Sequence, residues 1–247
     1  QLHLSFRNKT GRVHKMGKDS NLTISFSPHL VSPDATPWIM LRVSLALIPA
    51  VLAGVYFFGF KALSVILVSV AFCAIFEFLG CVLMRRPLSL IDFSFLVTGI
   101  LLALTLPPQI PWWMVVLGAG ISILVGKQIY GGLGKNIFNP ALVGRAFLVA
   151  CFPQYMTSWT SPFDGISCAT PLGLWKFHQQ LVGLKELFLG KVGGCIGETS
   201  SLALILGGIY LLSKRIIDWR IVLSYLGGVF LWAFIFYLKN PSWASPW

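Results

Sequence analysis

Residues 62–84, ALSVILVSVAFCAIFEFLGCVLM, form an apolar run with a single charged side chain, that of Glu77. A helix of about 20 such residues can cross the roughly 30 Å hydrocarbon core of a bilayer. The stretch therefore predicts a membrane-spanning helix. An acidic group in the middle of such a helix is costly, so Glu77 is a candidate to line an ion path or to pair with a partner subunit.

The rest of the chain has the same character. Of its 247 residues, 56% are hydrophobic and 11% are charged, whereas about a quarter of the residues of a soluble domain are charged. The same length rule predicts seven spans, at about residues 38–58, 62–84, 90–106, 111–130, 139–153, 194–212 and 220–238. The predicted fold class is all-α: a polytopic, integral membrane helical bundle.

The net charge of +11 raises the question of a nucleic-acid partner, because basic chains often bind phosphate backbones. Here the Lys and Arg residues stand mostly at the ends of the apolar runs and form no patch with interleaved aromatic residues. That placement is typical of the positive-inside rule, which sets the orientation of a membrane protein. We therefore expect contact with the lipid bilayer and no nucleic acid.

The basic residues fall in alternate connections between the spans. One set comprises those of the N-terminal tail, Arg85, Arg86, Lys127, Lys135, Lys214, Arg215 and Arg220; the other holds Lys61 and Lys239. The first set is predicted to be cytoplasmic. The expected organisation is a cytoplasmic segment 1–37, helices one to five in 38–153, an outer-side loop 154–193, and helices six and seven in 194–247.

Two polar stretches interrupt this pattern. In Gly131-Gly-Leu-Gly-Lys-Asn136 no Ser or Thr follows the lysine and no strand precedes the glycines, so a nucleotide-binding loop is excluded. Lys135, Asn136, Asn139 and Arg145 instead lie near the start of the next helix, where free N–H groups favour anions and polar cofactor edges. The alternative is a helix cap with Arg145 reaching the membrane interface.

The second stretch, Gly193-Gly-Cys-Ile-Gly-Glu-Thr-Ser-Ser201, places Glu198 and Thr199 near the predicted start of the sixth helix. An acid within a span is a functional candidate. A carboxylate capping the helix N-terminus is the alternative.

No metal site is predicted from the five cysteines. Cys73 and Cys81 share a helix but lie eight positions apart, roughly 12 Å along its axis. That is too far for one ion, because metal ligands are spaced more closely. Cys151, Cys168 and Cys195 are predicted on the outer side, where a disulfide is allowed, although ordinary thiols are the simpler interpretation.

The remaining stretch is Asp164-Gly-Ile-Ser-Cys-Ala-Thr-Pro-Leu172, in the predicted outer-side loop. Pro171 biases Thr170 towards an extended backbone. The hydroxyl of Thr170 is then expected to point outward, within reach of a modifying enzyme. The residues alone fit an ordinary Ser/Thr/Pro loop equally well.

Three motifs together carry a resemblance to a known family. They are Ser25-Phe-Ser-Pro-His29, Gly131-Gly-Leu-Gly-Lys-Asn-Ile-Phe-Asn-Pro-Ala141 with Gly144-Arg-Ala-Phe147, and Gly194-Cys-Ile-Gly-Glu-Thr-Ser-Ser201. From about residue 22 to its end, the chain resembles RnfD, a membrane subunit of the Rnf ferredoxin:NAD oxidoreductase, and its relative NqrB.

The resemblance implies a covalent flavin. In that family a flavin transferase, acting outside the cytoplasm, joins the phosphate of FMN to the Thr of an Asp-x-x-Ser/Thr-Gly-Ala-Thr motif. Asp164, Ser167, Ala169 and Thr170 match this motif, whereas Cys168 stands where the family usually has Gly. The other cofactor-binding candidates are Lys135, Asn136, Asn139, Arg145, Glu198 and Thr199, and a non-covalent riboflavin is a further expected cofactor.

The resemblance also implies partners and a location. The expected partners are the subunits RnfA, RnfB, RnfC, RnfE and RnfG, in a bacterial or archaeal cell (inner) membrane. Electrons from reduced ferredoxin would pass through the flavin towards NAD and drive Na⁺ or H⁺ across the membrane. The alternatives are an NqrB-type subunit of an NADH:quinone reductase, and a transporter or channel lined by Glu77 and Glu198. Family members continue past the seventh span, so further helices are expected after Trp247.

Overall fold

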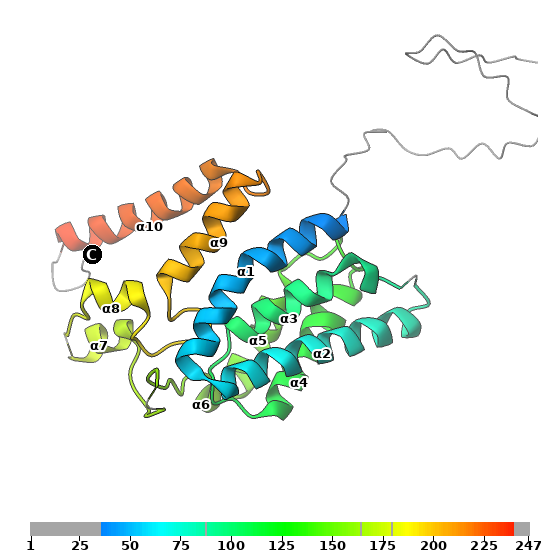
Figure 1. Ribbon diagram of the computed structural model, residues 1–247, viewed down its shortest axis with the longest axis horizontal. Helices are drawn as coiled ribbons and strands as arrows, with labels where there is room; N and C mark the ends of the chain where they lie inside the picture. The colour runs from blue at the N-terminus through cyan, green and yellow to red at the C-terminus, as the bar shows by residue number, and fades with distance from the viewer. Residues whose placement is uncertain (1–35, 87, 164, 179, 240–247) are drawn as a thin grey trace, which may run out of the picture. The chain divides into compact units, whose positions relative to one another are not determined.

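The computed structural model describes residues 36–86, 88–163, 165–178 and 180–239 (Figure 1). Within these ranges the regular elements are helices, apart from one antiparallel bridge between Thr160 and Ser167. The all-α membrane bundle predicted from hydrophobicity is confirmed. The predicted segment 1–37 lies almost wholly outside the described residues.

The helices are α1 (Thr36–Phe58), α2 (Phe60–Leu83), η1 (Leu90–Asp92), α3 (Ser94–Leu104), α4 (Trp112–Gly120), η2 (Ile121–Gln128), α5 (Pro140–Cys151), α6 (Pro153–Met156), α7 (Pro171–His178), α8 (Leu184–Leu189), α9 (Ser201–Ser213) and α10 (Trp219–Lys239).

Three helices, α1, α2 and α10, are long and apolar enough to cross a membrane, with 23, 24 and 21 residues. They correspond to the first, second and seventh predicted spans. Only Gly59 separates α1 from α2, and its φ is 64°. Glycine adopts this left-handed backbone without steric cost, which allows the chain to reverse between two helices within one residue.

Three other predicted spans are shorter as helices than expected. Helices α3, α5 and α9 have 11, 12 and 13 residues, which corresponds to roughly 16–20 Å at 1.5 Å per residue. A full crossing needs about 30 Å. The sixth helix begins at Ser201 and not near residue 194, and the third begins at Ser94 after the short turn η1.

Two irregular segments take the place of the missing helical turns. The N–H of Ile196 donates to the carbonyl of Leu106 at 3.1 Å, and that of Gly197 donates to the carbonyl of Leu104 at 2.8 Å. A Cβ on Gly197 would lie 2.8 Å from the Cβ of Leu104. Non-helical backbone is tolerated within a membrane only where protein groups satisfy it. The backbone of segment 195–200 is therefore satisfied by the end of α3 and by the segment that follows it.

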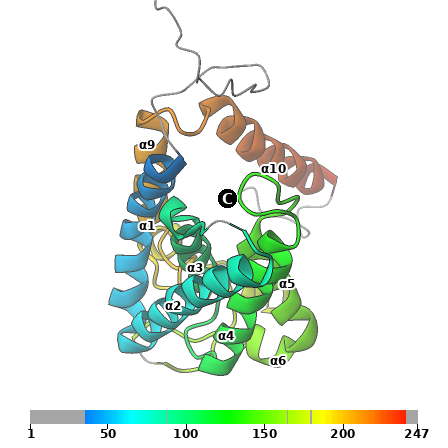
Figure 2. The same cartoon turned by 90° about the vertical axis from the view of Figure 1, so that its right-hand side faces the viewer.

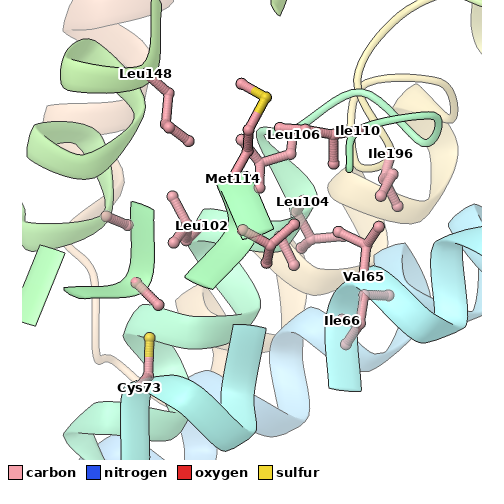
Figure 3. Close-up of a cluster of buried hydrophobic side chains, with 14 of the residues drawn as sticks. Val65, Ile66, Cys73, Leu102, Leu104, Leu106, Ile110, Met114, Leu148 and Ile196 are labelled. Carbon is pink, nitrogen blue, oxygen red and sulfur yellow. The ribbon is translucent and has the colours of Figure 1, made fainter. Parts of the chain in front are cut away.

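The hydrophobic core lies where these segments meet the helices. Figure 3 shows its members converging from α2, α3, α4, α5 and both irregular segments. They include Val65, Ile66, Leu102, Leu104, Leu106, Ile110, Met114, Leu148 and Ile196. Helix α2 packs against α3 and α4, and α9 packs along α1 (Figure 1).

Helix α10 is the one of the three long apolar helices in which no residue is buried. Figure 2 shows it set apart from α1–α5. A helix that is apolar on every face is suited to lipid or to a neighbouring membrane helix.

The two ends of the bundle are distinct. At one end the N–H of Phe163 donates to the carbonyl of Phe57, 3.1 Å away, which ties segment 152–200 to the junction of α1 and α2; we name this the loop end. Figure 1 shows α6, α7 and α8 on this side of the bundle. At the other end the Arg86 guanidinium donates to the carbonyl of Gln128 at 2.7 Å; we name this the basic end.

Candidate functional site

A short hairpin precedes Thr170 at the loop end. The N–H of Ser161 donates to the carbonyl of Ile166 at 2.8 Å, and that of Cys168 donates to the carbonyl of Trp159 at 3.0 Å. At the turn, the ring of Phe163 packs edge-on against Tyr56 and Phe57 of α1, with centroids 5.6 and 5.5 Å away. This aromatic contact fixes the hairpin to the bundle. Asp164 lies outside the described residues.

Cys168 lies against a glycine of the returning segment. A Cβ built on Gly193 would come within 2.2 Å of the Cys168 Sγ, so this thiol occupies the space that a side chain at position 193 would need. Partial burial raises the pKa of the Cys168 thiol above its usual value. The cysteine that replaces the expected glycine of the attachment motif is therefore accommodated by a glycine opposite it.

Thr170 stands immediately before α7. Its Oγ1 accepts a hydrogen bond from the N–H of Gly173 at 3.1 Å, as an N-capping side chain does. The residue is half-buried, and a Cβ on Gly173 would lie only 3.3 Å from the hydroxyl. The Thr170 hydroxyl thus faces the start of a helix, where N–H groups favour a negatively charged substituent.

Thr170 also lines a cavity that we name the loop-end cavity. Its volume is about 740 Å³, within the 300–1,000 Å³ typical of small-molecule sites. Four residues predicted from sequence share this cavity: Arg145, Thr170, Glu198 and Thr199. Among its other lining residues are Trp159, Leu172, Trp175, Gln180, Val182 and Leu187. Large apolar surfaces with a few polar groups are typical of a cofactor site.

The two charged residues of the loop-end cavity are not joined to each other. Arg145 is half-buried on α5, and Glu198 is exposed in segment 195–200. Both act electrostatically on the buried thiol of Cys195. Among the described residues, Arg145 has no carboxylate as an ion-pair partner. The N-cap of α9 is Ser200, whose hydroxyl accepts from Ala203, so the capping role considered for Glu198 is wrong.

Other predicted cofactor residues lie at the opposite end. Asn136 and Asn139 line a second cavity of about 260 Å³ together with Ser94, Thr98 and Lys127; we name it the basic-end cavity. Asn139 caps α5, with its side-chain oxygen accepting from the Ala141 N–H at 3.0 Å. The exposed residues Lys135, Ser167 and Ala169 line neither of these two cavities.

Glu77 is paired inside the bundle. Its Oε1 lies 2.6 Å from the Nζ of Lys127, and the two side chains are 0% and 1% exposed. Lys127 also donates to the Ser94 hydroxyl at 2.6 Å, and the Ser89 hydroxyl donates to Glu77. The Glu77 Oε2 has no hydrogen-bond partner among the described residues. Counting Lys127 with the cytoplasmic connections was wrong, because its charge is buried against Glu77.

A π-helical segment brings Lys127 to this position. Residues Ile121–Gln128 form the π-helix η2, whose turns are wider than those of an α-helix. Gln128, which follows Lys127, packs on Gly80 of α2. A Cβ at Gly80 would lie 2.8 Å from the Gln128 Cγ. Close approach at this glycine lets the two helices bury a charged pair.

Three residues that line the loop-end cavity are absent from the predicted cofactor-binding residues. They are Trp159, Trp175 and Gln180. The available signal is a tryptophan on either side of Thr170, at positions 159 and 175.

The bundle and its cavities define a class: a polytopic membrane protein with a cavity of small-molecule size at one end and a buried charge pair near the other. The model of the NQR2, RnfD, RnfE family matches residues 23–247, and the chain belongs to this family.

Its relatives belong to ion-translocating complexes of several bacteria, and each is the D component of its complex. The chain is 41% identical over 233 residues to that of the proton-translocating ferredoxin:NAD(+) oxidoreductase complex of Clostridium ljungdahlii, covering 88% of this chain and 70% of the relative. It is 42% identical over 221 residues to the Na(+)-translocating counterpart of Acetobacterium woodii, covering 87% and 70%. It is 37% identical over 241 residues to that of the ion-translocating oxidoreductase complex of Ectopseudomonas mendocina, again covering 87% and 70%.

Proposed function

We propose that this chain is a membrane subunit of an ion-translocating ferredoxin:NAD⁺ oxidoreductase and carries an FMN joined through its phosphate to Thr170. The similarity to components of such complexes over most of the chain supports the first part. The expected partners are the other subunits, RnfA, RnfB, RnfC, RnfE and RnfG, and a flavin transferase during maturation.

One observation carries the flavin proposal: the Thr170 hydroxyl lines a cavity of about 740 Å³ whose walls suit a flavin. A phosphate on Thr170 would lie at the start of α7, where the Gly173 N–H that now bonds to the hydroxyl is available. Trp159 and Trp175 offer aromatic surface. The residues present therefore fit the group.

FMN supplies the redox chemistry when it is bound, and the protein groups orient it and adjust its electronic properties. A covalent link keeps a flavin at its site without relying on affinity, because attachment makes the local concentration high. On the outer side of a membrane, where a dissociated cofactor is lost, that link is especially useful.

We further propose that the loop end faces the outside of the cell membrane. Without Lys127, the basic end still carries Arg85, Arg86, Lys135, Lys214, Arg215 and Arg220. The short connections of the loop end carry Lys61 and Lys239, and the lysines of the long loop (Lys176, Lys185 and Lys191) count little, because long loops are translocated largely regardless of charge. The excess in the short connections supports a cytoplasmic basic end. Thr170 then lies on the side where the transferase acts.

The basic-end cavity is the proposed site of a second, non-covalent flavin such as riboflavin. Asn136, Asn139 and Ser94 offer hydrogen bonds there. Its volume of about 260 Å³ is just below the usual range for small-molecule sites, which suits a flavin without a phosphate better than FMN. Asn136→Ala is expected to lower the acid-extractable flavin without changing the covalent flavin; an unchanged extract would contradict this assignment.

Glu77 is the proposed ion-path residue for Na⁺ or H⁺. Its buried position and its free Oε2 support this role, because ionisable groups inside a membrane commonly mark ion routes. In the intact complex, Glu77→Gln should reduce ion translocation driven by ferredoxin oxidation. Unchanged translocation would remove Glu77 from the path.

The flavin itself is tested on a denaturing gel. Cells that make the flavin transferase should yield a fluorescent wild-type band, and Thr170→Ala should abolish that fluorescence. Thr157→Ala is the matched control, since Thr157 is an exposed threonine of the same loop region, and it should stay fluorescent. Thr170→Ser keeps the hydroxyl and should retain part of the signal.

A dark wild-type band would refute the covalent flavin. The alternative of a transporter or channel lined by Glu77 and Glu198 would then gain support, because transporters use broken helices like α3 and α9 around their binding sites.

A further inference from the structure

We propose that Arg145 faces the pyrimidine edge of the flavin ring and sets the flavin's midpoint potential, with Glu198 acting in the opposite sense. This inference rests on the proposed FMN at Thr170. It assigns a redox-tuning role to a pair of charged residues that lie far apart in the sequence and meet at one cavity.

The positions of Arg145 and Thr170 give the flavin a direction. Arg145 lies six residues before Cys151, the last residue of α5, which is about 9 Å along the axis at 1.5 Å per residue. Thr170 belongs instead to the segment between α6 and α7, outside the membrane helices. Thr170 would therefore hold the phosphate end of a bound flavin, and Arg145, deeper in the wall of the same cavity, would hold its ring.

The charge of Arg145 is left for a ligand. Among the described residues, no carboxylate forms an ion pair with it, although it is half-buried within a membrane bundle. The Cys195 thiol, a weak acceptor, lies within the electrostatic reach of both Arg145 and Glu198. Buried charges in proteins are normally paired. A guanidinium without a carboxylate partner in a cavity wall is thus poised to meet a ligand's negative charge.

The flavin phosphate is not that negative charge. A phosphate on Thr170 has its own donors at the start of α7, among them the Gly173 N–H. Arg145 lies about 9 Å inside the end of α5. In a bound FMN the ring stands beyond the five-carbon ribityl chain from the phosphate and would be the part that Arg145 holds.

When bound, the flavin would supply two-electron redox chemistry, and with two electrons and one proton its reduced form would carry a negative charge at the pyrimidine edge. Arg145 is the residue that would hold that edge. A guanidinium offers paired N–H donors to such an edge. It therefore stabilises the reduced form more than the oxidised form, which raises the potential.

Glu198 lies in the wall of the same cavity and has the opposite effect. Its carboxylate disfavours a second negative charge nearby. Replacement of Arg145 and of Glu198 should hence shift the potential in opposite directions. If either residue had a purely structural role, the two substitutions would not be expected to shift the midpoint potential in opposite directions.

The test is a spectroelectrochemical titration of the purified full-length chain, loaded by the flavin transferase. The matching signal of Thr170→Ala is subtracted, so that only the covalent flavin is followed. Arg145→Gln should lower the ratio of reduced to oxidised flavin at a fixed potential by about tenfold, or about 30 mV for a two-electron couple. Glu198→Gln should raise that ratio several-fold.

Two further variants complete the set. Lys176→Gln removes the same charge from an exposed residue of α7 that does not line the cavity, and it should leave the potential unchanged. Arg145→Lys keeps the charge but loses the paired donors, so its potential should fall between those of the wild type and Arg145→Gln. The potential of the wild type should also change less steeply with pH than that of Arg145→Gln, because its reduced flavin stays deprotonated.

The outcomes separate this inference from the flavin proposal. A wild-type chain without covalent flavin refutes the flavin proposal itself. A flavinylated Arg145→Gln chain with the wild-type potential overturns the role of Arg145 while leaving the flavin in place. If Arg145→Gln does not fold or load, Arg145→Lys and Glu198→Gln decide, and wild-type potentials in both overturn the inference.

Discussion

Charged side chains are paired at one end of the bundle and unpaired with each other at the other end. At the basic end, Glu77 and Lys127 are 0% and 1% exposed and lie 2.6 Å apart, with serine hydroxyls completing the contacts. At the loop end, Arg145 and Glu198 line one cavity but form no ion pair with each other. The first pair is matched within the protein, and the second is spread around a space of about 740 Å³.

The difference separates a charge pair on which the fold depends, whatever part Glu77 has in an ion path, from charges that are open to a ligand. A buried charge needs a partner, and removing that partner is strongly destabilising. A charge in an open cavity keeps access to water or to a ligand, so its removal costs the fold little. The comparison therefore predicts a large structural effect at the basic end and a functional effect at the loop end.

The largest expected effect is that of Lys127→Met. This change leaves the Glu77 carboxylate buried without its cation, which should cost about 3–5 kcal/mol of folding free energy. Unfolding by SDS titration in mixed micelles measures the loss. Lys135→Met removes the same charge from an exposed residue of the following loop and should be near neutral.

The double variant Glu77→Gln/Lys127→Met should recover most of this stability, because both buried charges are then absent. If Lys127→Met alone is as stable as Lys135→Met, the pair does not hold the fold, and the contrast between the two ends fails.

At the loop end, stability should depend on steric fit instead of charge. Gly193→Ala places a Cβ 2.2 Å from the Cys168 Sγ, and overpacking of this kind costs about 1–3 kcal/mol. We expect a lower thermal unfolding midpoint and a weaker flavin band. Cys168→Gly removes the obstacle, so the double variant should recover. No recovery would show that Gly193 is required for its backbone, and not for the space it leaves.

The sequence predicted the helices well because hydrophobicity is a local property. It placed helix starts less well. Cys195 and Ile196 are apolar residues within the polar stretch 193–201, and the Ile196 N–H bonds to Leu106 across the bundle. The sequence does not reveal whether such a backbone is satisfied within a helix or by a distant segment, so the predicted start of the sixth helix, near residue 194, lies seven residues before the observed start at Ser201.

The candidate site was predictable in its members but not in their arrangement. The motifs named Arg145, Glu198 and Thr170, and only the fold shows them around one cavity, with Asn136 and Asn139 at another. The predicted place of Lys127 in a cytoplasmic connection is wrong for the same reason. A lysine at the end of an apolar run is typical of a membrane edge, and only the packing of η2 shows that this lysine pairs with Glu77.

The thiol of Cys168 offers a smaller test of how tightly the loop end is packed. Partial burial raises its pKa, and the thiolate is the form that alkylating reagents attack. At a given pH the folded chain should therefore react more slowly at Cys168 than the unfolded chain, and its rate should keep rising at pH values where the unfolded rate has levelled off. Mass spectrometry of the labelled peptide measures both rates, with Cys168→Ser as the blank. Equal rates would mean that the segment next to Thr170 is open to solvent.

The smallest expected effect completes the comparison. Arg145→Gln and Glu198→Gln should each change the free energy of unfolding by no more than about 0.5 kcal/mol, as is usual for residues outside a buried network. Their double-mutant cycle should give only a small coupling energy, because the two charges form no ion pair and meet through the Cys195 thiol alone. The same cycle on Glu77 and Lys127 should give a coupling of several kcal/mol. A strong coupling between Arg145 and Glu198 would mean that they pair in solution, and Arg145 would then not be free to meet the flavin.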